Sequence, residues 1–321
     1  MRVATSESEG FVREAEGFRR ELLAHCYRML GSVDDAEDLV QEVMLRAWRS
    51  YEKFEGRSSV RTWLYRIATN ACLSALQHRD RRYVPSGLGA PGDDPDGTIE
   101  LAGPEVRWVQ PIPDALVDPA EIVAGRNHLR LALIVSLQHL PPQQRAVLLL
   151  REVLAFSAAE VAGMLDLSVP AVKSSLQRAR AKLDELEPDG DQITEPSDIR
   201  ARALLDQYIA AFENSDAAAM GKLLRDDTVL EFSPSRTWFS GLRTCLPYLA
   251  NHALGSPGEW RMIPTTANGQ PAAATYRRTE SGTYEPLGIA VLTLADDGIA
   301  RITVFGDPTL VTTFAFPPTA N

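Results

Sequence analysis

The chain has 321 residues, 45% of them apolar and 24% charged, a composition typical of soluble globular proteins. The length predicts two or three domains, and no apolar run reaches the roughly 18 residues that a membrane-spanning helix needs. The N-terminal segment lacks the apolar core of a secretory signal, so we expect a cytoplasmic protein without membrane contact. Cys26, Cys72 and Cys245 form no CxxC pair, so we expect neither a disulfide framework nor a zinc site.

The net charge of −10 is unevenly distributed along the chain. Residues 57–82 carry six Arg against one Asp, and residues 168–183 carry four basic residues and no acidic one. By contrast, residues 86–125 carry one Arg and eight carboxylates, and residues 187–321 carry ten basic and seventeen acidic groups. The overall charge argues against a simple nucleic-acid coat protein, whereas the two short basic stretches indicate two separate contacts with a polyanion.

Residues 12–84 show a helical periodicity of apolar side chains throughout. Gly31 breaks the first helix, and Ser32 with Asp35 forms a capping-box pattern that starts the next one. A further helix is expected after Gly56.

The helix after Gly56 turns one face outward, with Trp63 on its flank; the residues on this face are Thr62, Arg66, Thr69, Asn70 and Gln77. Arg, Asn and Thr beside an aromatic ring suit unpaired bases, which offer a π-face and free hydrogen-bonding edges. The alternative for Trp63 and Tyr65 is that they complete the hydrophobic core.

Residues 85–118 change character, with Pro, Gly and Asp dominating residues 85–97. We interpret this acidic segment as a solvated linker with little structure of its own. Helices resume over residues 119–186, where Pro141-Pro142 opens a new helix. A second acidic linker covers residues 187–197.

Residues 155–183 contain the clearest functional motif. Ser157 with Glu160 forms a capping box for a helix that ends near Leu165, and Ser168 caps a second helix after a tight turn. Such a pair of helices is the DNA-reading unit whose second helix enters the major groove. The residues on the outward face and flanks of the second helix are Pro170, Lys173, Ser174, Gln177, Arg178, Arg180 and Lys182. The alternative is an amphipathic surface helix with a few basic residues.

Residues 198–321 predict an α+β domain with a curved antiparallel sheet. Helices are expected at 198–214 and 216–224, followed by runs rich in Val, Thr, Tyr, Trp and Ile with one helix at about 242–253. The strongest hairpin signal surrounds Asp296-Asp297-Gly298.

Three motifs in order resemble the extracytoplasmic-function sigma factors of the sigma-70 family. The run from Asp35 to Trp48 resembles sigma region 2.2, and Arg57 to Cys72 resembles regions 2.3 and 2.4. Leu140 to Arg151 with the helix-turn-helix resembles region 4. The resemblance implies two all-α domains, a region 2 bundle over 12–84 and a region 4 helix-turn-helix over 119–186.

This resemblance also implies partners and site residues. The protein would bind the RNA polymerase core, at its clamp and flap, and direct transcription from specific promoter DNA. Asp38, Gln41 and Glu42 would dock on the clamp, with a solvated acidic face as the alternative. The residues that would capture an extruded base of the −10 element are Arg57, Ser58, Thr62, Trp63, Arg66 and Asn70. The helix-turn-helix would read the −35 element as duplex, and the acidic linker would thread the RNA exit path.

The last domain resembles the SnoaL-like branch of the nuclear-transport-factor-2-like cone fold. The resemblance implies an apolar pocket, for which Phe232, Trp238 and Tyr276 are candidate liners, with a role in the core as the alternative. The titratable residues Asp206, Asp227, Glu231 and His252 form no pair at fixed spacing. We therefore expect no catalysis and no cofactor, but a module that senses a small ligand or docks a protein regulator and gates the sigma domains.

Two other classes of protein compete with this hypothesis. One is a small-molecule enzyme with an accessory DNA-binding domain, whose turnover would depend on Asp227, Glu231 or His252. The other is a repressor that binds an operator as a dimer without polymerase. The basic stretch around Arg66 and the expected polymerase-docking helix weigh against the repressor.

Overall fold

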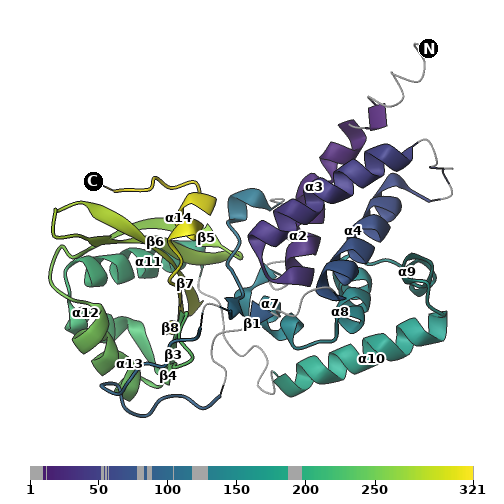
Figure 1. The fold of residues 1–321 in the computed structure, drawn as a ribbon. Helices are drawn as coiled ribbons and strands as arrows, with labels where there is room; N and C mark the ends of the chain where they lie inside the picture. Colours follow the sequence, from purple (N-terminus) through teal and green to yellow (C-terminus); the bar gives the residue numbers. More distant parts are fainter. Residues whose placement is uncertain are drawn as a thin grey trace. The chain divides into compact units, whose positions relative to one another are not determined.

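The computed structural model describes residues 10–11, 13–51, 54, 56, 58–77, 83–84, 89–103, 105–117, 129–186 and 197–320. Contacts divide the chain into two compact units (Figure 1). The helical unit comprises Met1–Tyr83 and Asp114–Gly190, and the sheet unit comprises Val84–Pro113 and Asp191–Asn321.

The helical unit consists of helices joined by short turns. Its elements are α2 (Arg19–Leu30), α3 (Val33–Ser50), α4 (Val60–Gln77), the 3-10 turn η2 (Asp114–Leu116), α7 (Leu131–Gln138), α8 (Pro142–Leu148), the π-helical turn η3 (Leu149–Val153), α9 (Ala158–Leu165) and α10 (Val169–Leu186). Gly31 ends α2 with a left-handed φ of 77°, and the Ser32 hydroxyl accepts the Asp35 amide over 3.3 Å at the start of α3. The predicted helix break and cap are confirmed.

One packed core joins the two helical segments of the sequence. Tyr27, Val43 and Leu64 are fully buried where α2, α3 and α4 meet. Helix α8 contacts both α2 and α4, and α9 contacts α4. Segments that lie on either side of residues 85–118 in the sequence therefore share one compact unit.

The sheet unit contains one large sheet with helices against it. Its elements are β2 (Arg107–Trp108), α11 (Asp198–Glu213), α12 (Ala217–Leu223), β3 (Leu224–Ser233), β4 (Phe239–Ser240), α13 (Leu242–Tyr248), the π-helical turn η4 (Leu249–Ala253), β5 (Trp260–Ala267), β6 (Gln270–Arg278), β7 (Tyr284–Ala295), β8 (Gly298–Phe305) and α14 (Pro308–Thr313). The short strand β1 (Tyr83–Val84) spans the boundary between the units.

The strand order of the large sheet is β4-β3-β8-β7-β6-β5. The predicted hairpin is confirmed, because β7 and β8 pair antiparallel from Ala295↔Gly298 onward. The prediction of a wholly antiparallel sheet is wrong, since β3 and β8 run parallel. The long connection between these two strands lets β8 return beside β3 in the same direction, and residue patterns within a strand carry no such information.

Helices α11, α12 and α13 cover one face of this sheet and enclose its core. Tyr208 and Phe212 of α11 pack with Leu230, Leu292 and Ile302 of the sheet in one hydrophobic cluster. This arrangement of helices on one face of a six-stranded sheet agrees with the α+β domain expected from the sequence.

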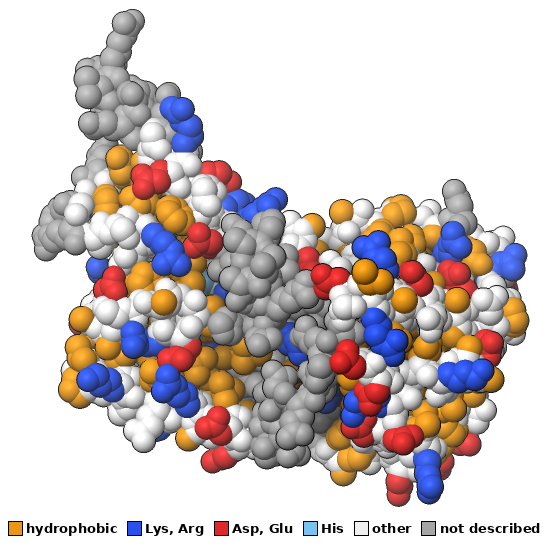
Figure 2. Space-filling model, turned by 180° about the vertical axis from the view of Figure 1, so that it is seen from behind, with side chains coloured by type: hydrophobic (Ala, Val, Ile, Leu, Met, Phe, Trp, Pro, Cys, Tyr) orange, Lys and Arg blue, Asp and Glu red, His pale blue; other side chains and the backbone are white. Residues whose placement is uncertain are grey.

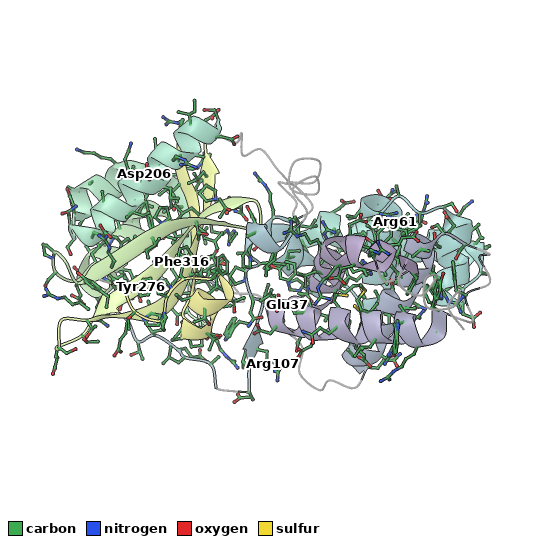
Figure 3. All side chains as sticks on the ribbon, turned by 90° about the horizontal axis from the view of Figure 1, so that it is seen from above. Glu37, Arg61, Arg107, Asp206, Tyr276 and Phe316 are labelled. Atoms are coloured by element: carbon green, nitrogen blue, oxygen red, sulfur yellow. The ribbon has the colours of Figure 1, made fainter. Side chains whose placement is uncertain are left out.

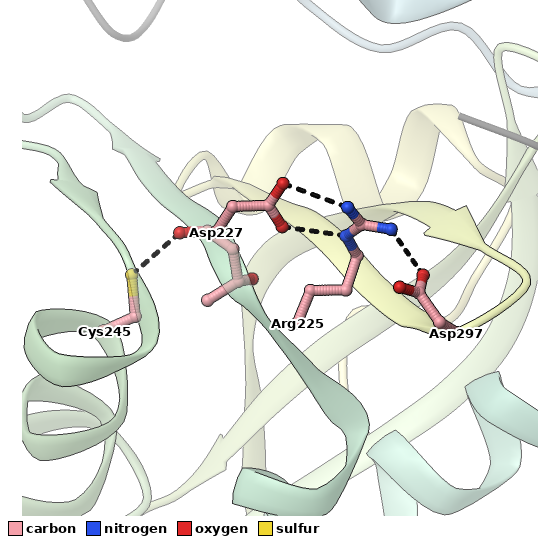
Figure 4. Close-up of polar contacts among 5 residues, drawn as sticks. Arg225, Asp227, Cys245 and Asp297 are labelled. Carbon is pink, nitrogen blue, oxygen red and sulfur yellow. Dashed lines mark hydrogen bonds and ion pairs between the residues drawn. The ribbon is translucent and has the colours of Figure 1, made fainter. Parts of the chain in front are cut away.

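An arginine ties the start of β3 to the turn between β7 and β8 (Figure 4). The Arg225 guanidinium donates to both carboxylate oxygens of Asp227, over 2.8 and 3.0 Å, and also to Asp297. These hydrogen bonds hold the pKa of Asp227 below its ordinary value. Nearby, the Cys245 thiol lies 3.5 Å from the Thr228 carbonyl oxygen, which brings α13 against β3.

The acidic segment that precedes α7 is attached to the sheet unit, unlike the solvated linker expected from its composition. We call residues 92–113 the strap. The amide of Gly92 donates to the Trp238 carbonyl over 2.7 Å, and the Arg236 amide donates to the Glu100 carbonyl over 2.8 Å. At the far end, Ile112 is fully buried and exchanges two 3.0 Å hydrogen bonds with Asn268. The physical reason for the difference is that the strap's backbone groups find partners on the sheet unit, which composition alone does not reveal.

Candidate nucleic-acid interface and cavity

The helix-turn-helix forms as predicted. The Ser157 hydroxyl accepts the Glu160 amide over 3.2 Å, and the Glu160 carboxylate accepts the Ser157 amide over 2.7 Å. Hydrogen bonds from the Ser157 side chain and backbone to its carboxylate lower the pKa of Glu160. Asp166 ends α9 in the left-handed conformation, and the Ser168 hydroxyl accepts the Ala171 amide to start α10.

Helix α10 buries one face and exposes the predicted DNA-reading face. Val172, Ser175 and Ala179 are buried against the rest of the unit. All seven predicted contact residues are exposed, namely Pro170, Lys173, Ser174, Gln177, Arg178, Arg180 and Lys182.

The cations of α10 differ in their charge partners. Arg180 pairs with Glu152 over 2.7 Å, and Lys182 pairs with Glu185 over 2.9 Å. Within the described ranges, Lys173 and Arg178 have no carboxylate partner. The α10 cations without an ion pair in the described ranges are therefore Lys173, near the start of the helix, and Arg178, near its middle.

Helix α4 presents the predicted −10 face. Ser59 caps the helix, since its hydroxyl accepts the Thr62 amide over 3.0 Å, and Arg66 and Asn70 are exposed one and two turns further on. The prediction that Thr69 lies on this face is wrong, because Thr69 is fully buried and its hydroxyl donates to the Tyr65 carbonyl over 2.7 Å. Ser58 is exposed just before the cap, while Arg57 lies outside the described residues.

The two aromatic residues of α4 separate into different environments. Trp63 is half-buried in a cluster with Phe54 and Phe11, at ring-centroid distances of 4.9 and 5.8 Å. Tyr65 is fully buried, and its hydroxyl donates to Glu21 over 3.2 Å. Tyr65 therefore completes the hydrophobic core, which was the alternative to base binding, whereas Trp63 keeps part of its ring exposed to solvent.

The exposed face of α3 combines acidic and apolar residues. Asp38, Gln41 and Glu42 are exposed, and Glu42 pairs with Arg46 over 2.5 Å. Leu45 and Trp48 continue the same face with 53% and 55% of their surface exposed. Sequence reasoning missed these two residues, although an apolar residue on the polar side of a helix is the signal that reveals them.

Side chains from the region 4 segment contact α2 and α4 within the helical unit. The buried Arg145 of α8 donates to the Met29 carbonyl at the end of α2 and to Gln138 over 2.6 Å. The ring of Phe156 lies 5.5 Å from that of Tyr65, and the Arg61 guanidinium lies 5.1 Å from the Phe156 ring centroid. Arg61 is labelled on this unit in Figure 3.

Asn70 takes part in the same internal contact. Its amide donates to the Met164 carbonyl of α9 over 3.1 Å and to the Arg66 carbonyl over 2.8 Å. A predicted −10 residue is thus held by the first helix of the helix-turn-helix.

A cavity of about 420 Å³ lies in the sheet unit between α11, η4 and the concave face of the sheet. Phe232 lines this cavity as predicted, but Tyr276 and Trp238 do not belong to its wall. Tyr276 faces the opposite side of β6, where its hydroxyl donates to the Pro317 carbonyl over 2.8 Å; Figure 3 labels it with Phe316 of the same C-terminal segment. Adjacent strand residues alternate between faces, so Thr275 and Arg277 line the cavity instead.

The candidate catalytic residues are mostly placed away from the cavity. Asp227 is held by Arg225, and Asp206 is exposed on α11. Glu231 is buried and forms an ion pair with Arg301. Its two neighbours in the sequence, Leu230 and Phe232, both line the cavity. His252 alone of the four lines the cavity, and its Nε2 lies 2.7 Å from the Asp96 carboxylate of the strap.

Neither a metal site nor a membrane-spanning helix is present in the part of the chain that the structure describes. No group of three or more His, Cys, Asp and Glu in these ranges is arranged to hold a metal ion. None of the helices described here is both long and apolar enough to cross a membrane. On the face shown in Figure 2, acidic and basic side chains are interspersed over the sheet unit rather than segregated by sign.

Comparison with known proteins covers almost the whole chain. The model of sigma-70 region 2 matches residues 15–82, and that of sigma-70 region 4 matches residues 130–183. The extracytoplasmic-function RNA polymerase sigma factor SigG of Mycobacterium tuberculosis is 46% identical over 312 residues, which cover 96% of this chain and 84% of the relative. SigW of Bacillus subtilis, a sigma factor of the same kind, is 28% identical over 183 residues, 56% of this chain and 90% of its own length.

One solved structure resembles both units. The crystal structure of the extracytoplasmic-function sigma factor SigJ of Mycobacterium tuberculosis matches with a TM-score of 0.60, covering 96% of this chain and 99% of that chain. The identity is 23%, so this likeness shows a common fold.

Proposed function

The chain belongs to the extracytoplasmic-function sigma factors of the sigma-70 family, and we propose that its sheet unit regulates the two sigma regions of the same chain. As a sigma factor, it binds the RNA polymerase core and directs transcription initiation at promoter DNA. The observation that carries the regulatory proposal is the strap, because the segment that joins regions 2 and 4 is bonded to the sheet unit.

For the −35 element, we propose that α10 enters the major groove. Ser174 and Gln177 would contact base edges, and Lys173 and Arg178 would neutralise phosphate. The support is their common exposure on one face and the absence of a carboxylate partner for either cation within the described residues. Arg180 and Lys182 would bind phosphate only after leaving Glu152 and Glu185.

For the −10 element, we propose that α4 captures an unpaired base. Thr62, Arg66 and Asn70 follow one another along the exposed face, and Trp63 offers a partly exposed ring beside them. Arg57 and Ser58 would complete this surface from the preceding loop.

For core polymerase, we propose that the exposed face of α3 docks on the clamp, and that region 4 contacts the flap. Asp38, Gln41 and Glu42 supply the polar contacts. Leu45 and Trp48 add exposed apolar surface whose removal from water would favour a complex. A polar rim next to a large exposed aromatic is the usual composition of a binding surface.

The proposed function also requires the helical unit to open. The −10 and −35 elements are separated by about 25 base pairs, which corresponds to roughly 85 Å of B-form DNA. Asn70 and Met164 are in hydrogen-bonding contact here, so the two readers cannot both reach their elements in this arrangement. We propose that binding of core polymerase separates them.

The strap would oppose this opening. Its residues are bonded to the sheet unit through Gly92, Glu100 and Ile112, and a segment held there cannot enter the RNA exit path. The strap must leave the sheet unit before it can take the position expected of a sigma linker.

The test is transcription by core polymerase from a promoter template that carries both elements. We expect initiation from the full-length protein and a higher rate from the Asp96→Ala variant, in which the strap loses its bonds to Asn251 and His252. Asp93→Ala is the matched control, because Asp93 is an exposed carboxylate of the same segment without a hydrogen bond in the described structure. Equal rates for Asp96→Ala and Asp93→Ala would contradict regulation through the strap.

We further propose that the sheet unit is not an enzyme and that the protein acts in the cytoplasm, with the polymerase. The pairing of Asp227 with Arg225 and of Glu231 with Arg301 supports the first point, since a general base needs an available carboxylate. Retained transcription by Asp227→Asn and Glu231→Gln, with thermal stability measured in parallel, is the expected result.

A further inference from the structure

The strap lies along one edge of the large sheet. Strand β4 is the outermost strand on this side, and we call residues 234–239, which run from the end of β3 into β4, the edge segment. Gly92 of the strap forms a bridge with Phe239, and Leu101 forms an antiparallel bridge with Ser235. The strap therefore follows the edge segment from one end to the other, although the two are far apart in the sequence.

Every second residue of the edge segment bonds to the strap through its backbone. The groups are the Pro234 carbonyl, the Arg236 amide and the Trp238 carbonyl. Their partners in the strap, at 2.7 to 2.8 Å, are the Ala102 amide, the Glu100 carbonyl and the Gly92 amide. Backbone groups of this kind pair with any extended chain, and an edge whose groups are unpaired is a template for another strand. Departure of the strap would therefore uncover a site for an extended peptide.

Two strap positions are selected by the shape of the site. The Ile99 side chain packs against the hydrophobic cluster inside the sheet unit. At Gly92 little room is left for a side chain, because an added Cβ would lie 3.1 Å from the Phe239 ring. The site therefore favours an aliphatic residue at one position and glycine seven residues before it.

A third position is selected by polar contacts. The Asp96 carboxylate accepts a hydrogen bond from Asn251 over 3.1 Å and lies 2.7 Å from Nε2 of His252. The Asp94 carboxylate accepts the Asp96 amide over 3.0 Å, which fixes the turn that presents Asp96. By contrast, the Leu101 side chain is 67% exposed and adds little to the contact. The pattern in the strap is thus a glycine, a carboxylate four residues later and an aliphatic residue three residues after that.

We propose that the edge segment is a docking site for an extended segment of a partner protein, which carries this pattern and displaces the strap. The assignment deepens the proposed regulatory function and rests on release of the strap for its purpose. The strap itself occupies the site, so its residues state the chemistry that a competitor needs. Because the strap is part of the same chain, its effective concentration is high, on the order of millimolar for a short flexible connection. A competitor therefore binds well only when the strap's own contacts are weakened.

The probe is a fluorescein-labelled peptide with the sequence of residues 92–103, and its binding to the full-length protein is followed by fluorescence anisotropy. Ile99→Asp in the protein weakens the strap and leaves the edge segment unaltered. We expect saturable binding to this variant, at least about tenfold tighter than to the unaltered protein, because the peptide keeps the isoleucine that the strap has lost. Ala102→Pro, which removes the amide bonded to Pro234, should have the same effect through a different contact.

Leu101→Asp is the matched control, because it makes the same kind of change at an exposed position of the strap. It should bind the peptide as weakly as the unaltered protein does. A peptide with Asp in place of Ile99 should not bind. A peptide with Ala in place of Asp96 should bind about two- to tenfold more weakly, the range of one hydrogen bond. This loss should disappear when the protein also carries Asn251→Ala and His252→Ala.

Three outcomes would overturn the proposal. One is no peptide binding to either variant with a weakened strap, where Ala102→Pro decides the test if Ile99→Asp lowers the melting temperature. Another is binding that the two peptide substitutions leave unchanged. The third is a concentration-dependent dimer of the unaltered protein that Ile99→Asp abolishes, because the occupant would then be the strap of a second copy.

These outcomes are distinguishable from failure of the regulatory proposal, because peptide binding is measured without polymerase. Equal transcription by Asp96→Ala and Asp93→Ala, together with the expected peptide binding, would contradict regulation through the strap and leave the docking site standing. Faster transcription by Asp96→Ala without peptide binding would do the reverse.

Discussion

The side-chain amide of Asn70 donates a hydrogen bond to the backbone carbonyl of Met164 over 3.1 Å. Asn70 belongs to the helix proposed to capture the −10 element, and Met164 belongs to the first helix of the helix-turn-helix. The contact is reinforced by Phe156 against Tyr65 and by Arg145 on the Met29 carbonyl. If α4 and the helix-turn-helix read the −10 and −35 elements as proposed, they would have to span roughly 85 Å of duplex DNA, so we propose that this arrangement is closed with respect to promoter binding.

Separation of α4 from α9 can be measured by energy transfer. All three native cysteines are buried, so Ser74→Cys on α4 and Ala159→Cys on α9, both at exposed positions, provide selective labelling sites. We expect high transfer efficiency in the free protein and a near-complete loss in the complex with core polymerase and promoter DNA. A single-label protein is the control for environmental changes of the dyes. Unchanged transfer in a transcriptionally active complex would show that the two helices stay together.

Reversal of charge on the docking face of α3 should prevent assembly with polymerase. Asp38→Arg places a cation where the clamp is expected to present one, and we expect it to weaken core binding by roughly 2 kcal/mol or more. Circular dichroism should be unchanged, because Asp38 is exposed. Asp206→Arg makes the same charge change on an exposed helix of the sheet unit and should bind core normally. Co-purification of Asp38→Arg with core at the unaltered level would refute the docking assignment.

Replacement of Lys173 should weaken promoter binding without changing sequence preference. Lys173→Ala removes an exposed cation that has no carboxylate partner in the described structure. Removing one ion pair with phosphate lowers the slope of log affinity against log salt by about one. Binding of the holoenzyme to promoters that differ in the −35 element, measured over a salt series, tests this. Lys222→Ala is the control, since it removes an exposed cation from the sheet unit. A weakening restricted to particular −35 sequences would instead make Lys173 a base reader.

The bond between the strap and the cavity rim should depend on the charge of Asp96. Hydrogen bonds from Asn251 and His252 hold the pKa of the Asp96 carboxyl below its ordinary value of 3.8. When folding lowers the pKa of a carboxyl, the carboxyl stabilises the fold fully at a pH above its ordinary pKa. This stabilisation is lost as the pH falls through the lowered pKa of the folded state. We therefore expect the Asn251 side-chain amide signal in NMR to stay constant at neutral pH and to titrate with a midpoint below 3.8.

The control for this titration is Asp96→Asn, in which the Asn251 signal should no longer follow the pH between about 5 and the acid limit of the fold. A midpoint at or above 3.8 in the unaltered protein would show that the carboxyl is not engaged with Asn251 and His252 in solution.

Local features are predictable because their causes lie within a few residues. The caps at Ser32 and Ser157, the start of α8 at Pro142 and the β7–β8 hairpin each depend on neighbouring side chains and backbone preferences. The exposed residues of α10 follow from the step of about 100° per residue in a helix.

Features that depend on distant partners are not predictable in the same way. The sequence pattern assigns Tyr276 to the cavity, but the pleat of β6 turns it to the far side, where it meets Pro317. Composition predicts a solvated strap, yet its amides and carbonyls are bonded to residues more than a hundred positions away.

The sequence by itself determined the family, most of the helices, the β7–β8 hairpin and the two basic stretches proposed to contact DNA, because these rest on periodicity and short motifs. The tertiary structure alone decided that β8 runs parallel to β3, that the segment between the sigma regions lies on the sheet unit, and that the Tyr208 hydroxyl is buried without a hydrogen-bond partner among the described residues. The physical reason is that direction of strand pairing and satisfaction of buried polar groups depend on which distant atoms come within hydrogen-bonding reach, and only the folded chain fixes that.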